Sequence, residues 1–148
     1  MSISIRPYQP EDFDAITLLW RQTREDAFPE FQRNRGHTFS EDRAYFRDVI
    51  LINNQVWVAE AGGNVAGFIA INGSFIDHLF VAPAFQRRGI GRVFLEHARK
   101  LSPDFLRLYT FQFNQSGRTF YEKNGFRAVK FGISPPPESE PDVEYYWL

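Results

Sequence analysis

The chain has 148 residues, a mass of 17.3 kDa and a formal net charge of −1. This length suits one buried core, so we expect a single domain over residues 1–148. The balanced charge argues against a dedicated nucleic-acid-binding domain. The absence of cysteine excludes disulfides, thiolate metal sites and a cysteine nucleophile. No apolar run approaches the roughly 20 residues of a membrane span, and no signal peptide is recognisable, so we expect a cytoplasmic protein.

The N-terminal part of the chain predicts one strand and two helices. Residues 2–6 alternate apolar and polar side chains, as a short strand does. Pro10 precedes two acids, which is typical of a helix start. Thr38, with Glu41 three residues later, forms a capping-box pattern that predicts the start of a second helix. Residues 24–37 lie between the helices, and we expect a loop or a broken helix there.

The middle of the chain predicts most of a sheet. Residues 55–60 and 65–71 flank a Gly-Gly turn and form a hairpin, and both strands are apolar on each face. Helices should therefore cover both sides of the sheet. Residues 75–81, 89–101 and 106–113 are expected to form strand, helix and strand, which is a parallel crossover unit.

The C-terminal part adds a short helix at residues 116–123 and a strand at 126–133. Residues 134–148 begin with prolines and acids but end in aromatic side chains, so we expect a loop and then a last packed strand. The whole pattern predicts a mixed α/β fold. Its central mixed sheet should have about six to seven strands, with about four helices distributed over both faces.

The segment that carries chemistry is Gln-Arg-Arg-Gly-Ile-Gly at residues 86–91, between the strand at 75–81 and the following helix. A helix N-terminus offers unpaired N–H groups and a positive dipole end, and glycines let an anion approach closely, so the segment suits a pyrophosphate. A Rossmann fingerprint would need a third glycine where Phe94 stands, and no P-loop Gly-Lys-Ser/Thr is present. For this motif alone, a basic glycine turn that merely starts a helix remains the alternative.

Two blocks together resemble the GCN5-related N-acetyltransferase (GNAT) superfamily. The first is residues 86–91 preceded by Leu-Phe-Val-Ala-Pro, and it matches the Arg/Gln-x-x-Gly-x-Gly/Ala signature. The second has Asn114, then Phe-Tyr121 seven residues on, then Gly-Phe126. The family usually has alanine where Gly117 stands, which departs from the pattern without breaking the assignment. The blocks cover about a third of the chain, and the expected element order matches the family fold over nearly all of it.

The resemblance implies an acetyl-coenzyme A site and no metal. Strand backbone would pair with the pantetheine arm, and N–H groups at the helix start would hold the pyrophosphate. The residues implied in binding are Leu79, Phe80, Val81, Gln86, Arg87, Arg88, Gly89, Ile90, Gly91, Arg92, Asn114 and Tyr121.

The implied reaction needs two proton transfers. A lysine-like amine has a pKa near 10.4 and attacks only when neutral, so a base or a water chain must remove its proton. We expect Tyr121 to be the acid for the departing thiolate and Asp77 to be the base, with Glu60 or water as alternatives. The family's usual glutamate position falls near Phe75, which cannot titrate. Strand alternation places His78 on the opposite face from Asp77, as a satisfied buried histidine.

The expected function is an N-acetyltransferase that passes the acetyl group directly to a primary amine, since no enzyme thiol exists to carry it. Residues 24–38 and 133–143 should shape the acceptor pocket, and their acids would favour a cationic amine such as a polyamine, an aminoglycoside or a protein N-terminus. Solvated loop charge is the alternative interpretation of those acids. A non-enzymatic acyl-coenzyme A-binding or regulatory module is the alternative function. We expect acetyl-coenzyme A and the amine as partners, a homodimer, and neither nucleic acid nor membrane.

Overall fold

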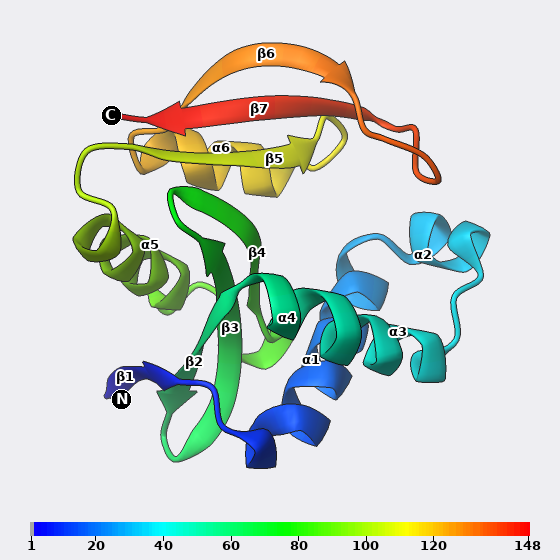
Figure 1. Ribbon diagram of the computed structural model, residues 1–148, viewed down its shortest axis with the longest axis vertical. Coiled ribbons are helices and arrows are strands. Elements are labelled where there is room, and N and C mark those ends of the chain that lie inside the picture. Colours follow the sequence, from blue (N-terminus) through cyan, green and yellow to red (C-terminus); the bar gives the residue numbers. More distant parts are fainter. Residues whose placement is uncertain (1) are drawn as a thin grey trace.

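The central element is a sheet whose strand order is β1-β2-β3-β4-β5-β7-β6. The computed structural model describes residues 2–148, and seven strands form this one sheet within them (Figure 1). The strands are β1 (Ile3–Pro7), β2 (Gln55–Ala61), β3 (Asn64–Asn72), β4 (Phe75–Val81), β5 (Leu106–Phe111), β6 (Arg127–Ile133) and β7 (Pro141–Trp147). Strands β4 and β5 pair in parallel, as the crossover pattern predicted, and the other neighbours are antiparallel.

Helices cover both faces of this sheet, which confirms the mixed α/β prediction. They are α1 (Phe13–Ala27), α2 (Pro29–Arg35), α3 (Phe39–Tyr45), α4 (Leu51–Asn53), α5 (Ile90–Leu101) and α6 (Gln115–Lys123). A π-helical turn, Phe46–Ile50, joins α3 to α4. Figure 1 shows α5 on one side of strands β2 to β4, and α1, α3 and α4 on the other. Within residues 2–148, no helix is both long and apolar enough to cross a membrane.

The segment between the first two predicted helices is a broken helix rather than a loop. Helix α1 continues to Ala27, and Pro29 begins α2 at the position where proline is best tolerated. Helix α2 ends at Gly36, whose φ of +69° is the left-handed conformation typical of a helix C-terminus. The capping box predicted for the next helix is present, because Thr38 Oγ1 accepts from the Glu41 N–H and Glu41 Oε1 accepts from the Thr38 N–H.

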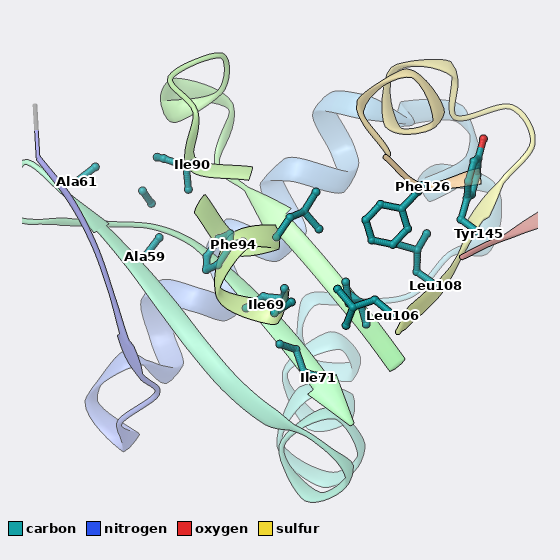
Figure 2. Close-up of a cluster of buried hydrophobic side chains, with 14 of the residues drawn as sticks. Ala59, Ala61, Ile69, Ile71, Ile90, Phe94, Leu106, Leu108, Phe126 and Tyr145 are labelled. Atoms are coloured by element: carbon teal, nitrogen blue, oxygen red, sulfur yellow. The ribbon is translucent and has the colours of Figure 1, made fainter. Parts of the chain in front are cut away.

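One apolar core connects the two halves of the sheet. Figure 2 shows this cluster running from Ala59 of β2, past Phe94 of α5, to Phe126 and Tyr145 beside α6 and β7. The second core lies on the other face, where Trp20, Phe46 and Phe68 belong to the same buried cluster. Burial of these side chains is the main source of stability, because each removes apolar surface from water.

The feature that positions the site is the divergence of β4 and β5. Their register contains a single paired position, Phe75 with Arg107. The Arg107 N–H also donates to the Ser74 carbonyl at 2.9 Å, just before β4. Beyond that point β4 runs on to Val81 and β5 to Phe111 without pairing to each other. Backbone groups along these inner edges therefore lack a strand partner, and the sheet opens there.

Replacing Phe94 tests how strongly the shared core holds this arrangement. Phe94 is fully buried at 0% exposure, so we expect Phe94→Ala to lower the free energy of unfolding by about 3–5 kcal/mol in urea denaturation. Leu18→Ala is the control, because Leu18 is 46% exposed and its loss should cost roughly 0.5 kcal/mol or less. Equal losses in the two variants would show that the core does not depend on Phe94.

Candidate functional site

A cavity of about 1020 Å³ occupies the opening between the diverging strands. Its walls come from β4 and β5, from helices α1 to α3, and from the segment that joins β6 to β7. Asn114 and Tyr121 also line it, together with residues 76–80 of β4. The structure thus brings the predicted strand residues, the second sequence block and both predicted acceptor segments to one place.

The 86–91 segment connects β4 to the start of α5. The Gln86 side chain donates to the Val81 carbonyl at 2.9 Å, so it fastens the loop to the end of the strand. Arg87 and Gly89 both have positive φ, +64° and +86°, and Gly89 directly precedes α5. Residues 86–89 are exposed, whereas Ile90 is buried at 1% exposure and anchors the helix start. The loop therefore presents its backbone to the outside at the positive end of a helix.

Gly91 has a second role that the sequence pattern did not reveal. A side-chain Cβ at this position would lie 2.8 Å from the Phe120 ring of α6. Glycine therefore lets the first turn of α5 approach α6, which is separate from the anion-binding role predicted for it. Arg92 is exposed and lies 3.8 Å from Glu96 one turn later, and the Arg88 guanidinium lies 5.6 Å from the Phe85 ring.

Asn114 fixes the start of α6 against the end of β5. Its Oδ1 accepts from the Gly117 N–H at 3.1 Å, and its Nδ2 donates to Thr110 Oγ1 at 2.9 Å. A Cβ on Gly117 would overlap the Asn114 side chain. In this structure the cap fills the space that a methyl group at residue 117 would need.

Tyr121 lies on α6 and lines the cavity. Its ring packs against Phe120 at 5.2 Å and Phe126 at 5.7 Å between ring centroids. Burial raises the pKa of the Tyr121 phenol above its ordinary value, because the low dielectric disfavours the phenolate. Within residues 2–148 the hydroxyl has no hydrogen-bond partner, so a neutral O–H donor remains available to the cavity.

Asp77 and His78 lie on the same side of the sheet, which corrects the prediction of opposite faces. Ala70 pairs with His78 but Ile71 pairs with Ile76, so Asp77 is the extra residue of a β-bulge. Strand alternation fails at that point: Ile76 and Leu79 pack into the same core. The prediction that residues 75, 77, 79 and 81 share one face is therefore wrong.

The bulge places Asp77 and His78 beside each other in the cavity wall. Asp77 Oδ2 accepts from Asn54 Nδ2 at 3.0 Å and lies 3.6 Å from His78 Nε2. The His78 ring lies edge-on to Trp20 of α1, with 5.9 Å between centroids. Burial lowers the pKa of the His78 imidazole, and Asp77 acts in the opposite direction. His78 is thus a neutral imidazole next to a carboxylate. Within residues 2–148 its ring nitrogens make no hydrogen bond, so the prediction of a satisfied histidine is wrong.

The structure contradicts the alternative that Glu60 is the base. Its carboxylate accepts from Arg6 Nε at 2.5 Å across the β1–β2 pair, and it does not line the cavity. Among residues 2–148, no group of three or more His, Asp or Glu side chains is arranged to hold a metal ion.

The acceptor side of the cavity contains paired charges. Arg24 donates to Asp42 at 2.6 Å while its guanidinium lies 4.0 Å from the Trp20 ring centroid. Arg35 of α2 donates to Glu138 at 2.7 Å and so links α2 to the segment between β6 and β7. The acids of residues 24–38, namely Glu25, Asp26 and Glu30, do not line the cavity, whereas His37 does.

Comparison with known proteins agrees with this architecture. The acetyltransferase (GNAT) domain profile matches residues 53–128. The peptidyl-lysine N-acetyltransferase YiaC of Escherichia coli is 34% identical over 126 residues, or 84% of each chain. The solution structure of apo-form YjaB from Escherichia coli has a TM-score of 0.82 and 24% identity, covering 100% of this chain and 99% of that one. The acetyltransferase YncA of Salmonella typhimurium, solved with acetyl-coenzyme A, has a TM-score of 0.70 and 17% identity, covering 99% and 93%.

The chain therefore belongs to the GNAT family of acetyltransferases, as its two sequence blocks predicted. It is an acetyl-coenzyme A-dependent N-acetyltransferase with an amine acceptor, and the enzymatic interpretation holds over the non-enzymatic one.

Proposed function

We propose that the acceptor is the side-chain amine of a lysine in a peptide or protein. The observation that carries this proposal is the cavity at the β4–β5 divergence, which is about 1020 Å³ and lined by both an acid–imidazole pair and a partly buried tyrosine. A cavity of this size accommodates an extended lysine side chain together with the acyl end of the coenzyme. The relative YiaC is a peptidyl-lysine N-acetyltransferase, which supports the same acceptor.

The coenzyme would enter along the open edge of β4. Unpaired backbone groups of Leu79 to Val81 suit the amides of the pantetheine arm, in the manner of an added strand. The N–H groups from Arg87 to Arg92 suit the pyrophosphate at the start of α5, with Gln86 and Ile90 fixing the loop. Asn114 would act mainly through the α6 cap, since both ends of its amide already have partners.

Tyr121 is proposed as the acid toward the departing sulfur. Because burial raises the pKa of its phenol, the hydroxyl stays protonated at physiological pH. An ordinary thiol has a pKa near 8.5, so full proton transfer from this phenol would be uphill. A hydrogen bond from the Tyr121 O–H to the developing thiolate is therefore the step we assign to it.

Asp77 is proposed as the group that takes the proton of the attacking amine. A second acceptor lies beside it, because the lowered pKa of His78 keeps that imidazole neutral. An imidazolium formed at His78 would in turn be stabilised by the Asp77 carboxylate 3.6 Å away. The pair thus offers a proton path whose ends are held by Asn54 and by the Trp20 ring.

Residues 1–148 are proposed to act as one catalytic domain, because a single sheet includes strands from Ile3 to Trp147. The cytoplasmic location, the homodimer and the absence of nucleic-acid and membrane partners stay predictions.

Replacing Gly89 tests the phosphate loop. A valine there would strain the φ of +86° and place a side chain over the exposed backbone, so we expect coenzyme A to bind at least tenfold more weakly in calorimetric titration. Gly63→Val is the matched control, because Gly63 has a similar φ of +80° in open space in the β2–β3 turn. Unchanged affinity in Gly89→Val would remove the pyrophosphate from this loop.

Asp77→Asn tests the base. The amide keeps the shape of the side chain but cannot accept the amine proton, so kcat should fall by about 10²-fold or more. Asp104→Asn, an exposed substitution in the loop after α5, should leave kcat unchanged. A kcat for Asp77→Asn near the wild-type value would contradict the proposal, because the amine proton would then be taken by water or by His78 alone.

The acceptor itself is tested with an N-terminally blocked peptide that contains one lysine. Incubation with acetyl-coenzyme A should release thiol and add one acetyl group to the peptide, whereas the same peptide with arginine should not react.

In Tyr121→Phe, kcat should fall by roughly 10²-fold while coenzyme A affinity stays within a factor of about two. Thiol release without acetylated peptide, or full activity in Tyr121→Phe, would contradict the assignment.

A further inference from the structure

Asp142 is a mostly buried residue whose carboxylate has no partner within the described residues. It lies on β7, between Phe111 of β5 and Gly132 of β6, and only 9% of the residue is exposed. Its backbone carbonyl accepts from Gln112 Nε2 at 2.9 Å. Within residues 2–148, however, the carboxylate oxygens make no hydrogen bond and no ion pair. Carboxylates in such positions normally meet a counter-charge or a hydrogen-bond donor.

The carboxylate is directed at the cavity. Asp142 belongs to the cavity wall, and so do its neighbours Phe111 and Gly132. A Cβ on Gly132 would lie 3.5 Å from Asp142 Oδ1, so the glycine leaves that oxygen uncovered from the β6 side. The chain therefore leaves the Asp142 carboxylate open to a ligand in the cavity.

The cations of the cavity are engaged elsewhere. Arg24 is paired with Asp42 and Arg35 with Glu138. Lys130 and Arg107 both lie near Glu144, which is two residues along β7 from Asp142. Lys130 is the register partner of Glu144, and Arg107 approaches the Glu144 carboxylate to 3.9 Å. Within residues 2–148 no positive side chain forms an ion pair with Asp142, so a ligand in the cavity can supply the opposite charge.

Aromatic rings complete the surroundings. Phe111, the register partner of Asp142, lies 5.2 Å from both Phe31 of α2 and Phe113 between ring centroids. Ring faces attract cations, and their low polarity strengthens the attraction between a carboxylate and a positive group. The ligand that fits is an ammonium or guanidinium group.

The position of Asp142 relative to β4 sets the spacing. Strand β7 is separated from β4 by β5, and strands lie about 4.8 Å apart, so Asp142 is roughly 10 Å or more from the edge of β4 across the opening. The amine that reacts beside Asp77 therefore cannot itself occupy Asp142. An extended peptide rises about 3.3 Å per residue, so a side chain about three residues away reaches this distance.

We propose that Asp142 forms a subsite for a second positive charge of the acceptor, and that the enzyme selects lysines with another basic residue about three positions away. This inference rests on the proposed peptide-lysine function. It adds a specificity-determining residue and a substrate class that the family assignment does not supply.

The test compares blocked peptides with a single lysine and either arginine or glutamine at each position from four before to four after it. For the wild-type enzyme, arginine at the best position should raise kcat/KM by about tenfold to a hundredfold over glutamine. Asp142→Asn should remove this preference while leaving the rate on the all-glutamine peptide within about twofold. Glu140→Gln, an acid of the same segment that does not line the cavity, should keep the preference.

The outcomes separate the two claims. If no lysine peptide is acetylated, the proposed function fails. If peptides are acetylated equally with arginine and glutamine, only the Asp142 subsite is overturned. This comparison uses the wild-type enzyme alone, so it does not depend on whether a variant folds. Acetylation of a free diamine that depends on Asp142, without acetylation of any peptide, would support the cation subsite. It would also show that the bound positive charge belongs to a small amine and not to a peptide.

Discussion

The divergence of β4 and β5 is the constraint on which the site depends. Backbone groups in a sheet normally pair with both neighbours, yet these strands share one paired position, Phe75 with Arg107. What keeps the halves together is the apolar cluster beneath them, which includes Ile69 of β3, Phe94 of α5 and Leu108 of β5. The core therefore supplies the cohesion that missing ladder bonds do not, and the opened edge remains free to bind a strand-like substrate.

Two local features position the residues proposed for proton transfer. The bulge at Asp77 turns a side chain that alternation would place with Leu79 toward the cavity that α1 to α3 cover, next to His78. The Asn114 cap ties α6 to Thr110 at the end of β5, and α6 carries Tyr121. The residues proposed as acid and base thus line the same cavity, on elements held by hydrogen bonds of Asn114 and Asn54.

The sequence predicted what depends on local pattern and missed what depends on pairing. Strand and helix order, the Thr38 capping box and the loop at 86–91 follow from spacing along the chain, and the structure contains them. The prediction that Asp77 and His78 lie on opposite faces was wrong because their placement depends on the register of β4 against β3. Periodicity within β4 cannot reveal this register. The isolation of Asp142 was equally hidden, since it follows from the order β5-β7-β6 and from Gly132 opposite it.

The net charge of −1 is the sum of segments with opposite charge. Arg87, Arg88 and Arg92 gather at the start of α5, where a polyanionic coenzyme would dock. Residues 134–148 contain four acids and no lysine or arginine, and Asp142 brings one of those acids into the cavity unpaired. The coenzyme is a polyanion and the proposed peptide acceptor carries positive charge, so the arginines at the start of α5 would attract the one and Asp142 the other. Charge separation along the chain would then help to order the two substrates around the reacting centre.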